Sequence, residues 1–201
     1  MSGRGSNLRR LLELDRDNDL GGARIVAVAT NRASCPAAGT SREFAVPTRV
    51  FAQRDFGDSE ARDAAMRDWL LAQQVELVVL AGYDRVLSRG FTAAFPDRVI
   101  NIHPSLLPAF GGGMNAVEEA LAHGVRVTGC TVHLLGDEVD AGPIILQAAV
   151  PVEEDDTPES LHARIQAEEH GILPEAVRLL ASGRVHRDGS RVVIRSPEPV
   201  A

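Results

Sequence analysis

The segment from Asn101 to His103 carries the clearest sign of chemistry in the sequence. It lies at the end of an apolar run typical of a buried strand, and residues two apart in a strand point to the same face. Asn101 and His103 should therefore project together at the carboxyl end of that strand, where open α/β sheets bind ligands. An amide donor beside an imidazolium can stabilise an oxyanion, and a histidine can transfer a proton near neutral pH. The alternative is an Asn and a His that only hydrogen-bond to loop backbone.

Three acids, Asp137, Glu138 and Asp140, lie in a short loop between two apolar segments. A carboxylate facing His103 would favour the charged imidazolium, but the spacing does not indicate which acid does so. The same acids with His103 or His133 could hold a divalent cation, although the compact ligand spacing of a metal site is lacking. We therefore expect no metal. A solvated turn is the structural alternative.

A glycine-containing loop precedes a helical pattern near the N-terminus, and it includes Gly5, Ser6 and Asn7. Backbone N–H groups and the dipole at a helix start attract an anion, and glycine allows a phosphate to approach closely. The alternative is a tight turn followed by an ordinary N-cap, because Ser and Asn are also capping residues. Leu8 stands where a dinucleotide fingerprint has its third glycine, which argues against nicotinamide binding.

A carboxylate falls on the apolar face of the long helix expected near the C-terminus. Glu169 lies in the same stripe as Ile165 and Leu173, at the four-residue step, and Gln166 lies on the adjoining face. A carboxylate among inward positions needs a partner. A substrate amine or sugar hydroxyl would provide one, and so would an internal salt bridge.

Helical and strand patterns alternate around these residues. Strands separated by helices imply crossover connections and a doubly wound, mostly parallel sheet with helices on both faces. An Asp188-Gly189 turn predicts a hairpin near the C-terminus. The helix predicted at 58–73 should bury the face that carries Ala61, Ala65, Trp69 and Leu70. Helices are predicted at residues 7–15, 58–73, 115–123 and from the Thr157 N-cap to about 183, and strands at 24–30, 75–82, 98–102, 125–135 and 143–150.

The composition excludes several classes of function. The 201-residue chain has a net charge of -7, which gives no overall attraction to nucleic acid or to an anionic membrane surface. Its apolar runs are too short to cross a bilayer, and no secretion signal is recognisable. Cys35 and Cys130 are expected to be reduced thiols. We expect a cytoplasmic, single-domain protein, monomeric or homodimeric, that acts on small molecules and not on nucleic acid or membranes.

Together, these segments resemble phosphoribosylglycinamide formyltransferase, a folate-dependent family of purine synthesis. The resemblance extends from the glycine loop to about Gly183 and is carried by residues 80–83 (LAGY), 101–108 (NIHPSLLP), 128–133 (TGCTVH) and 140–147 (DAGPIILQ). It implies a formyltransferase-like Rossmann variant with a phosphate-binding half at 1–100, a catalytic and folate-binding half at 101–183, and a hairpin and tail at 184–201.

The resemblance also implies an activity and the residues that perform it. The formyl group of 10-formyltetrahydrofolate, the co-substrate, would pass to the amine of 5'-phosphoribosylglycinamide in IMP synthesis, without a metal. The implied catalytic residues are Asn101, His103 and Asp140, with Asp140 keeping His103 charged. The implied substrate-binding residues are Gly5, Ser6, Asn7, Gln166 and Glu169, and the implied folate-binding residues are Arg85, Leu87, Val139 and Asp140.

The sequence departs from the family at three places. The family's opening strand is not recognisable before the glycine loop, so we expect the first strand to be missing and the native start to lie upstream. Asp84 stands beside Arg85 where many members carry an apolar residue. The segment 110–115 is also richer in glycine than its usual counterpart.

Two alternative functions remain open at this point. A formyltetrahydrofolate deformylase would share the Asn–His–Asp centre and pass the formyl group to water, but such proteins resemble this one with an additional N-terminal regulatory domain. A folate- or nucleotide-binding module without activity would fit a chain that lacks its first strand. A methionyl-tRNA formyltransferase would need an RNA-binding extension and a basic surface, which are not recognisable here.

Overall fold

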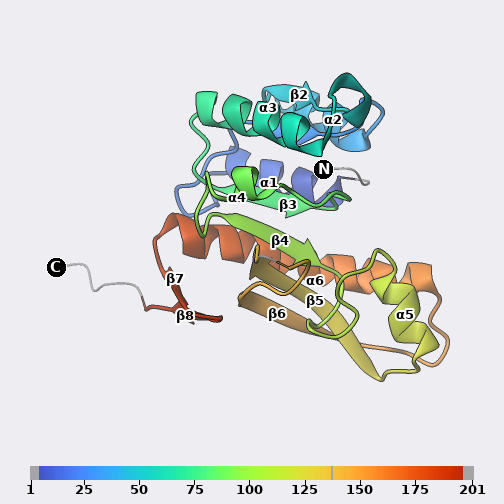
Figure 1. The fold of residues 1–201 in the computed structure, drawn as a ribbon. Coiled ribbons are helices and arrows are strands. Elements are labelled where there is room, and N and C mark those ends of the chain that lie inside the picture. Colours follow the sequence, from blue (N-terminus) through green and yellow to red (C-terminus); the bar gives the residue numbers. More distant parts are fainter. Residues whose placement is uncertain (1–4, 137, 197–201) are drawn as a thin grey trace. The chain divides into compact units, whose positions relative to one another are not determined.

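The computed structural model describes residues 5–136 and 138–196, which form an α/β protein (Figure 1). The chain divides into two compact units: residues 1–17 and 24–101 form unit 1, and residues 18–23 and 102–201 form unit 2. The boundary falls inside strand β4 (Val99–His103). One strand therefore contributes Asn101 to unit 1 and His103 to unit 2.

Unit 1 alternates helices with short strands (Figure 1). Strands β1 and β2 pair in parallel, with Val28 opposite Thr48, and helix α2 makes the crossover that parallel pairing requires. The elements are α1 (Ser6–Arg16), β1 (Val28–Thr30), α2 (Pro36–Glu43), β2 (Thr48–Val50), the 3-10 helix η1 (Gln53–Asp55), α3 (Ser59–Ala72), β3 (Val78–Ala81) and α4 (Arg89–Thr92). One of its apolar clusters joins α1, β1 and α2 through Leu8, Leu12, Val28, Cys35 and Ala37.

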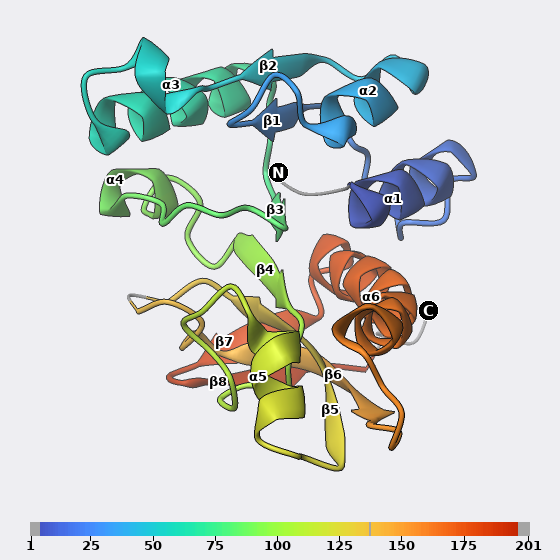
Figure 2. The same ribbon diagram turned by 90° about the vertical axis from the view of Figure 1, so that its right-hand side faces the viewer.

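Unit 2 is built around an antiparallel strand pair covered by a long helix. Strands β5 and β6 pair from Val127 opposite Pro151 to His133 opposite Ile144, and α6 packs on both strands (Figure 2). The elements after β4 are α5 (Ala116–Ala122), β5 (Val127–Leu134), β6 (Ile144–Pro151), α6 (Pro158–Ala181), β7 (Val185–Asp188) and β8 (Arg191–Ile194). An apolar cluster of this unit consists of Val117, Cys130, Val150, Leu161 and Ile165.

The sheets combine parallel and antiparallel pairs. Strands β3, β4, β5 and β6 are hydrogen-bonded in that order in a four-stranded sheet, and β1-β2 and β7-β8 form two-stranded sheets. The β5-β6 pair is antiparallel because the connection at residues 135–143 is too short for the crossover that parallel neighbours need. The β7-β8 pair is antiparallel as well, and its Asp188 faces Arg191 across the turn predicted from Asp188-Gly189.

The predicted helices are present, with ends that agree to within about two residues, whereas β1 and β3 are shorter than predicted. A strand was expected at 24–30, but β1 begins at Val28. The reason lies in Asp15, whose carboxylate accepts the Ile25 N–H at 3.2 Å and pairs with Arg24 Nε at 2.6 Å. The backbone N–H of Ile25 is thus bonded to a side chain instead of a neighbouring strand.

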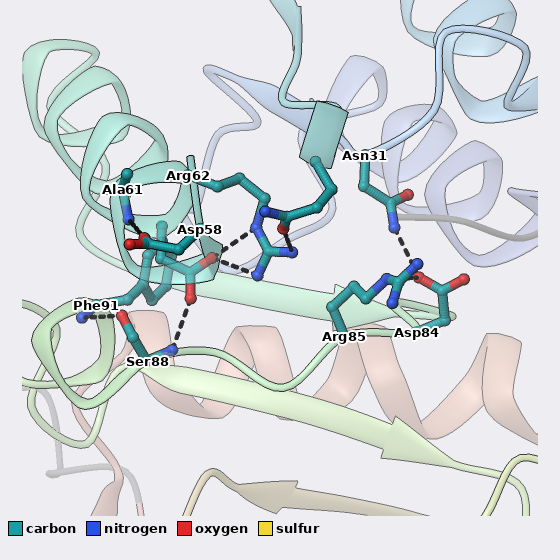
Figure 3. Close-up of polar contacts among 10 residues, drawn as sticks. Asn31, Asp58, Ala61, Arg62, Asp84, Arg85, Ser88 and Phe91 are labelled. Carbon is teal, nitrogen blue, oxygen red and sulfur yellow. Dashed lines mark hydrogen bonds and ion pairs between the residues drawn. The ribbon is translucent and has the colours of Figure 1, made fainter. Parts of the chain in front are cut away.

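The buried face of α3 differs from the prediction. Ala61 is exposed, whereas Arg62 and Asp63 are almost completely buried. Two guanidinium nitrogens of Arg62 donate to Asp63 Oδ1 at 2.7 and 2.9 Å, and a third donates to Gln53 Oε1 at 2.9 Å. Asp63 Oδ2 accepts the Ser88 N–H at 2.7 Å (Figure 3). A pattern of apolar residues cannot reveal this face, because a buried ion pair with satisfied hydrogen bonds replaces part of it.

The start of α6 is as predicted. Thr157 is the N-cap, and Pro158 occupies the first helical position. The Thr157 hydroxyl accepts the Ser160 N–H at 3.2 Å, and the Ser160 hydroxyl accepts the Thr157 N–H at 3.0 Å. This reciprocal pair is a capping box, and it fixes the start of the helix that carries Gln166 and Glu169.

The structure bears on three further predictions, which concern the cysteines, membrane-crossing helices and the missing first strand. Cys35 and Cys130 are free thiols and are buried. Over residues 5–136 and 138–196, no helix is both long and apolar enough to cross a membrane. The first described element is α1, and residues 1–4 lie outside the described residues, so the missing first strand stays a prediction.

Candidate active site

His103 is the last residue of β4 and only 5% of its surface is exposed. Its Nδ1 lies 3.3 Å from Asp140 Oδ2, and its Nε2 lies 2.9 Å from the carbonyl oxygen of Phe110. Both ring nitrogens therefore face acceptors. Only the imidazolium carries a proton on each nitrogen, so only that form can donate to both acceptors at once.

The Asp140 carboxylate contacts three groups with its two oxygens. Oδ2 meets His103 and also accepts the Gly112 N–H at 2.9 Å, while Oδ1 lies 3.6 Å from Nε2 of His133. Burial raises the pKa of the Asp140 carboxyl, but hydrogen bonds from His133 and Gly112 and the charge of His103 outweigh that effect and lower it below the ordinary value. Asp140 is thus a carboxylate near neutral pH.

The acidic loop brings one of its acids to His103. Asp140 has a left-handed backbone, with φ of 55°, and its carboxylate lies against His103 at the end of β4. Glu138 and Val139 are exposed, and Asp137 lies outside the described residues. Asn101 is half-buried in β4, two residues before His103.

A buried network holds the segment that follows His103. The Thr131 hydroxyl donates to the carbonyl oxygen of Ser105 at 2.7 Å and accepts the Leu107 N–H at 3.0 Å. Gln147 Nε2 donates to Thr131 Oγ1 at 2.9 Å and to the Leu107 carbonyl at 3.0 Å. Strands β5 and β6 thereby fix the backbone next to the imidazole. Sequence reasoning assigned no role to Thr131 or Gln147, although both lie in the segments that carried the resemblance.

The glycine loop enters α1 through Gly5, whose φ is 81° and whose side-chain position is closed by α2. A Cβ on Gly5 would lie 3.1 Å from Cα of Ala37. Ser6 and Asn7 lie inside the helix, so the alternative of an ordinary Ser or Asn N-cap does not hold: Gly5 is the N-cap, and a glycine has no side chain that could cap the helix. A left-handed glycine at this point presents the first N–H groups of α1 without a capping side chain.

The two residues predicted on α6 differ in exposure. Glu169 is 6% exposed, while Gln166 is half-buried. Glu169 lies close enough to Cys130 to affect it: burial, and then the charges of Glu169 and Glu168, raise the pKa of the Cys130 thiol to about 12. Cys130 is therefore not a nucleophile near neutral pH.

In unit 1, Asp84 joins the ends of β1 and β3. Asp84 Oδ1 accepts Asn31 Nδ2–H at 2.7 Å and lies 3.8 Å from Arg85 Nε (Figure 3). Its Oδ2 pairs with the guanidinium of Arg32. The acid at the position where the family resemblance implied an apolar residue is thus paired with its neighbours. Arg85 is half-exposed, and Leu87 is 9% exposed.

A cavity of about 400 Å³ lies beside Asp140 in unit 2. The terminal hairpin contributes part of its wall, although the resemblance ends before the hairpin. Its lining residues are Leu107, Pro108, Asp140, Ala141, Gly142, Ile144, Ser190, Arg191 and Val192. In the part of the chain that the structure describes, no three His, Cys, Asp or Glu residues are grouped to hold a metal ion.

Comparison with known proteins identifies the family to which this chain is similar. A profile of the formyl transferase family matches residues 1–177. The chain is 42% identical to phosphoribosylglycinamide formyltransferase of Mycobacterium tuberculosis, over 96% of this chain and 91% of that protein. It is 44% identical to the trifunctional purine biosynthetic protein adenosine-3 of Bos taurus, of which it spans 18%.

The solved structures give the same result for the fold. The crystal structure of glycinamide ribonucleotide transformylase 1 from Symbiobacterium toebii matches with a TM-score of 0.95 and 46% identity, covering 98% of this chain and 92% of that chain. The formyltransferase-type α/β fold predicted from the sequence is therefore confirmed. The Bos taurus relative is much longer than this chain, so what the longer protein does is not by itself a statement about this one.

Proposed function

The chain belongs to the formyl transferase family, and from this premise we propose that it transfers the formyl group of 10-formyltetrahydrofolate to the amine of 5'-phosphoribosylglycinamide. The observation that carries the proposal is the His103–Asp140 pair, with 3.3 Å between Nδ1 and Oδ2. The similar proteins of matching length are phosphoribosylglycinamide formyltransferases, which supports this donor and acceptor.

His103 and Asn101 stabilise the charge that develops on the formyl oxygen. The acceptor amine attacks the formyl carbon, and the carbonyl oxygen becomes an oxyanion that accepts hydrogen bonds from the Asn101 amide and from Nε2–H of His103. In the structure, the Phe110 carbonyl accepts the Nε2–H, so the formyl oxygen takes the place of that carbonyl. Preorganised donors of this kind are worth about 3–4 kcal/mol each.

Asp140 keeps the imidazolium charged and assists the proton transfer. A carboxylate at ion-pair distance favours the protonated imidazole, and the lowered pKa of Asp140 keeps it ionised. When the intermediate collapses, the bond between the formyl carbon and folate N10 breaks. The attacking amine loses a proton, and N10 gains one through the His103–Asp140 pair. The products are the formylated amine and tetrahydrofolate.

The remaining site residues bind the two substrates. We assign the acceptor phosphate to Gly5, Ser6 and Asn7, because the uncapped N-terminus of α1 presents backbone N–H groups. We assign the ribose and glycinamide to Gln166 and Glu169, of which Glu169 is a buried carboxylate. We assign the folate to Arg85, Leu87, Val139 and Asp140, and we expect no metal to take part.

The acceptor distinguishes this function from its alternatives. We expect formylfolate to be consumed only when phosphoribosylglycinamide is present. Equal turnover without the acceptor would instead indicate a deformylase, and binding of both compounds without any product would indicate an inactive module. The cytoplasmic location, the single-domain organisation, the monomeric or homodimeric state and the lack of nucleic-acid or membrane partners remain predictions.

The test of the site is His103→Ala, measured with both substrates. We expect kcat/KM to fall by about 10²–10⁴-fold, with an unchanged circular dichroism spectrum. His186→Ala on β7 is the matched control, because it removes a half-buried histidine from the terminal hairpin, and its activity should match the unmodified protein. A folded, fully active His103→Ala protein would refute the role of His103.

A further inference from the structure

His133 is a buried histidine that the mechanism above does not use. It lies on β5 with 1% of its surface exposed. The pairing of β5 with β6 shifts at this residue: Val132 faces Leu146, but His133 faces Ile144, so β6 carries one extra residue, Ile145. Bulges of this kind change the direction of a side chain and are frequent beside active sites.

Hydrogen bonding determines which nitrogen of His133 is protonated. Nδ1 lies 2.9 Å from the carbonyl oxygen of Leu134, which can only accept, so Nδ1 carries a proton. Nε2 then faces Asp140 Oδ1 at 3.6 Å. A neutral ring would direct a lone pair at a carboxylate oxygen, whereas the imidazolium directs an N–H at it. An attractive contact with Oδ1 therefore needs an N–H on Nε2.

We propose that His133 is a positioning residue that holds the Oδ1 oxygen of Asp140 from the sheet side and thereby fixes Oδ2 against Nδ1 of His103. The proposal rests on the proposed function, since it concerns the same carboxylate. The Gly112 N–H bonds Oδ2 from the loop side at 2.9 Å. Together, His133 and Gly112 fix the carboxylate at both of its oxygens, so the plane of the carboxylate cannot rotate away from the imidazole.

The charges around Asp140 support this role. His103 comes from β4 and His133 from β5, and both favour the ionised carboxylate. Arg191 on β8 lines the cavity that Asp140 also lines, and Glu138 lies in the same loop as Asp140. Of these groups, His133 is the one whose replacement removes the imidazole that faces Oδ1 and leaves the His103 pair in place.

The experiment replaces His133 by an apolar residue of similar size and measures both catalysis and the carboxylate. In His133→Leu we expect kcat to fall by about ten- to hundred-fold, because a loosely held catalytic group loses alignment, with KM for both substrates unchanged. We also expect the pKa of Asp140 to rise when it is followed through its carboxyl carbon by carbon-13 NMR, with the signal assigned from an Asp140→Asn sample. The acid limb of the kcat/KM profile should shift to higher pH in the same direction.

Val132→Ala is the control for a purely structural effect. Val132 is fully buried beside His133 in the same strand, so its truncation lowers the melting temperature without touching Asp140. We expect this variant to keep both kcat and the carbon-13 titration of the unmodified protein. If His133→Leu does not fold, His133→Gln serves instead for the titration, because it keeps an N–H donor but removes the charge.

The outcomes separate this proposal from the proposed function. If the unmodified protein does not transfer the formyl group, the proposed function fails, and the carbon-13 titration alone decides the role of His133. An unchanged Asp140 midpoint in a folded His133 variant overturns the positioning role whatever the activity. An unchanged kcat in an active, folded His133→Leu protein overturns it as well.

Discussion

At the scale of single residues, one carboxylate is shared by two buried histidines. Asp140 faces His103 with one oxygen and His133 with the other, and the Gly112 amide bonds the same oxygen as His103. An isolated buried carboxylate would be protonated more readily than in water. These partners reverse that tendency, so the charge of Asp140 is a property of its contacts.

The lowered pKa of Asp140 predicts a specific loss of stability in acid. Because the folded-state pKa lies below the unfolded value of about 3.9, ionised Asp140 stabilises the fold above that pH, and the contribution is lost as the pH falls through the folded-state pKa. Urea unfolding at pH 5, 4 and 3 should show a stability difference between the unmodified protein and Asp140→Asn that shrinks with falling pH.

A control acid tests whether that effect belongs to the site. Asp188 is exposed at the end of β7, and Asp188→Asn should leave the pH dependence of unfolding as it is in the unmodified protein. A difference for Asp140→Asn that stays constant from pH 5 to pH 3 would contradict a lowered pKa. Asp140→Asn should also lose most of its transferase activity, because it no longer favours the charged form of His103.

At the scale of elements, the two ends of the β5-β6 connection, which carries Asp140, are held close together. Leu134 N–H bonds the Pro143 carbonyl at 2.9 Å, and Gly136 and Gly142 lie against each other with no room for side chains. A Cβ on Gly142 would lie 1.8 Å from the Leu134 carbonyl oxygen. The glycine of the Asp-Ala-Gly-Pro segment is therefore required by the approach of two backbone strands.

Two glycine substitutions of opposite expected sign test this closure. Gly142→Ala should destabilise the protein by about 1–3 kcal/mol, as overpacking does, and should lower activity by displacing Asp140. Gly171→Ala lies in the exposed face of α6 with no atom within 4 Å of the new Cβ, and it should stabilise the protein by up to about 1 kcal/mol. Both free energies are measured by urea unfolding; a Gly142→Ala protein as stable as the unmodified one would show that the connection can open without cost.

At the scale of the whole molecule, two compact units each have their own apolar cluster, and the chain carries a net charge of -7. The charge balance opposes binding to a polyanion, whose attraction to proteins depends on neutralising phosphates with Lys and Arg. It does not oppose a small anionic substrate, which needs only local N–H groups or a single cation.

The charge predicts that the protein does not bind RNA at physiological salt. In an electrophoretic mobility experiment with transfer RNA at about 0.15 M salt, we expect no shift at micromolar protein. Lowering the salt should produce none either, since there is no net positive charge whose screening is relieved. A shift that strengthens as salt is removed would reveal a basic surface and would argue for an RNA-linked substrate.

The sequence by itself determined the features that depend on neighbouring residues. The N-cap at Thr157, the turn after Asp188 and the helix at residues 7–15 are fixed by hydrogen bonds or periodicity within a few residues, and the structure has them where they were predicted. The motifs also identified the fold, because each of them is a continuous run of residues that can be recognised in the sequence.

The family resemblance had already implied that Asp140 is the acid beside His103, and only the tertiary structure showed what holds that acid. Spacing alone left Asp137, Glu138 and Asp140 equivalent, and it presented His133 only as a possible metal ligand. The left-handed backbone of Asp140 and the extra residue of β6 beside His133 are visible only in the structure, and the extra residue arises from how β5 and β6 pair. The buried Arg62–Asp63 pair on α3 has the same origin, because a charged side chain can turn inward only where the rest of the fold supplies its partners.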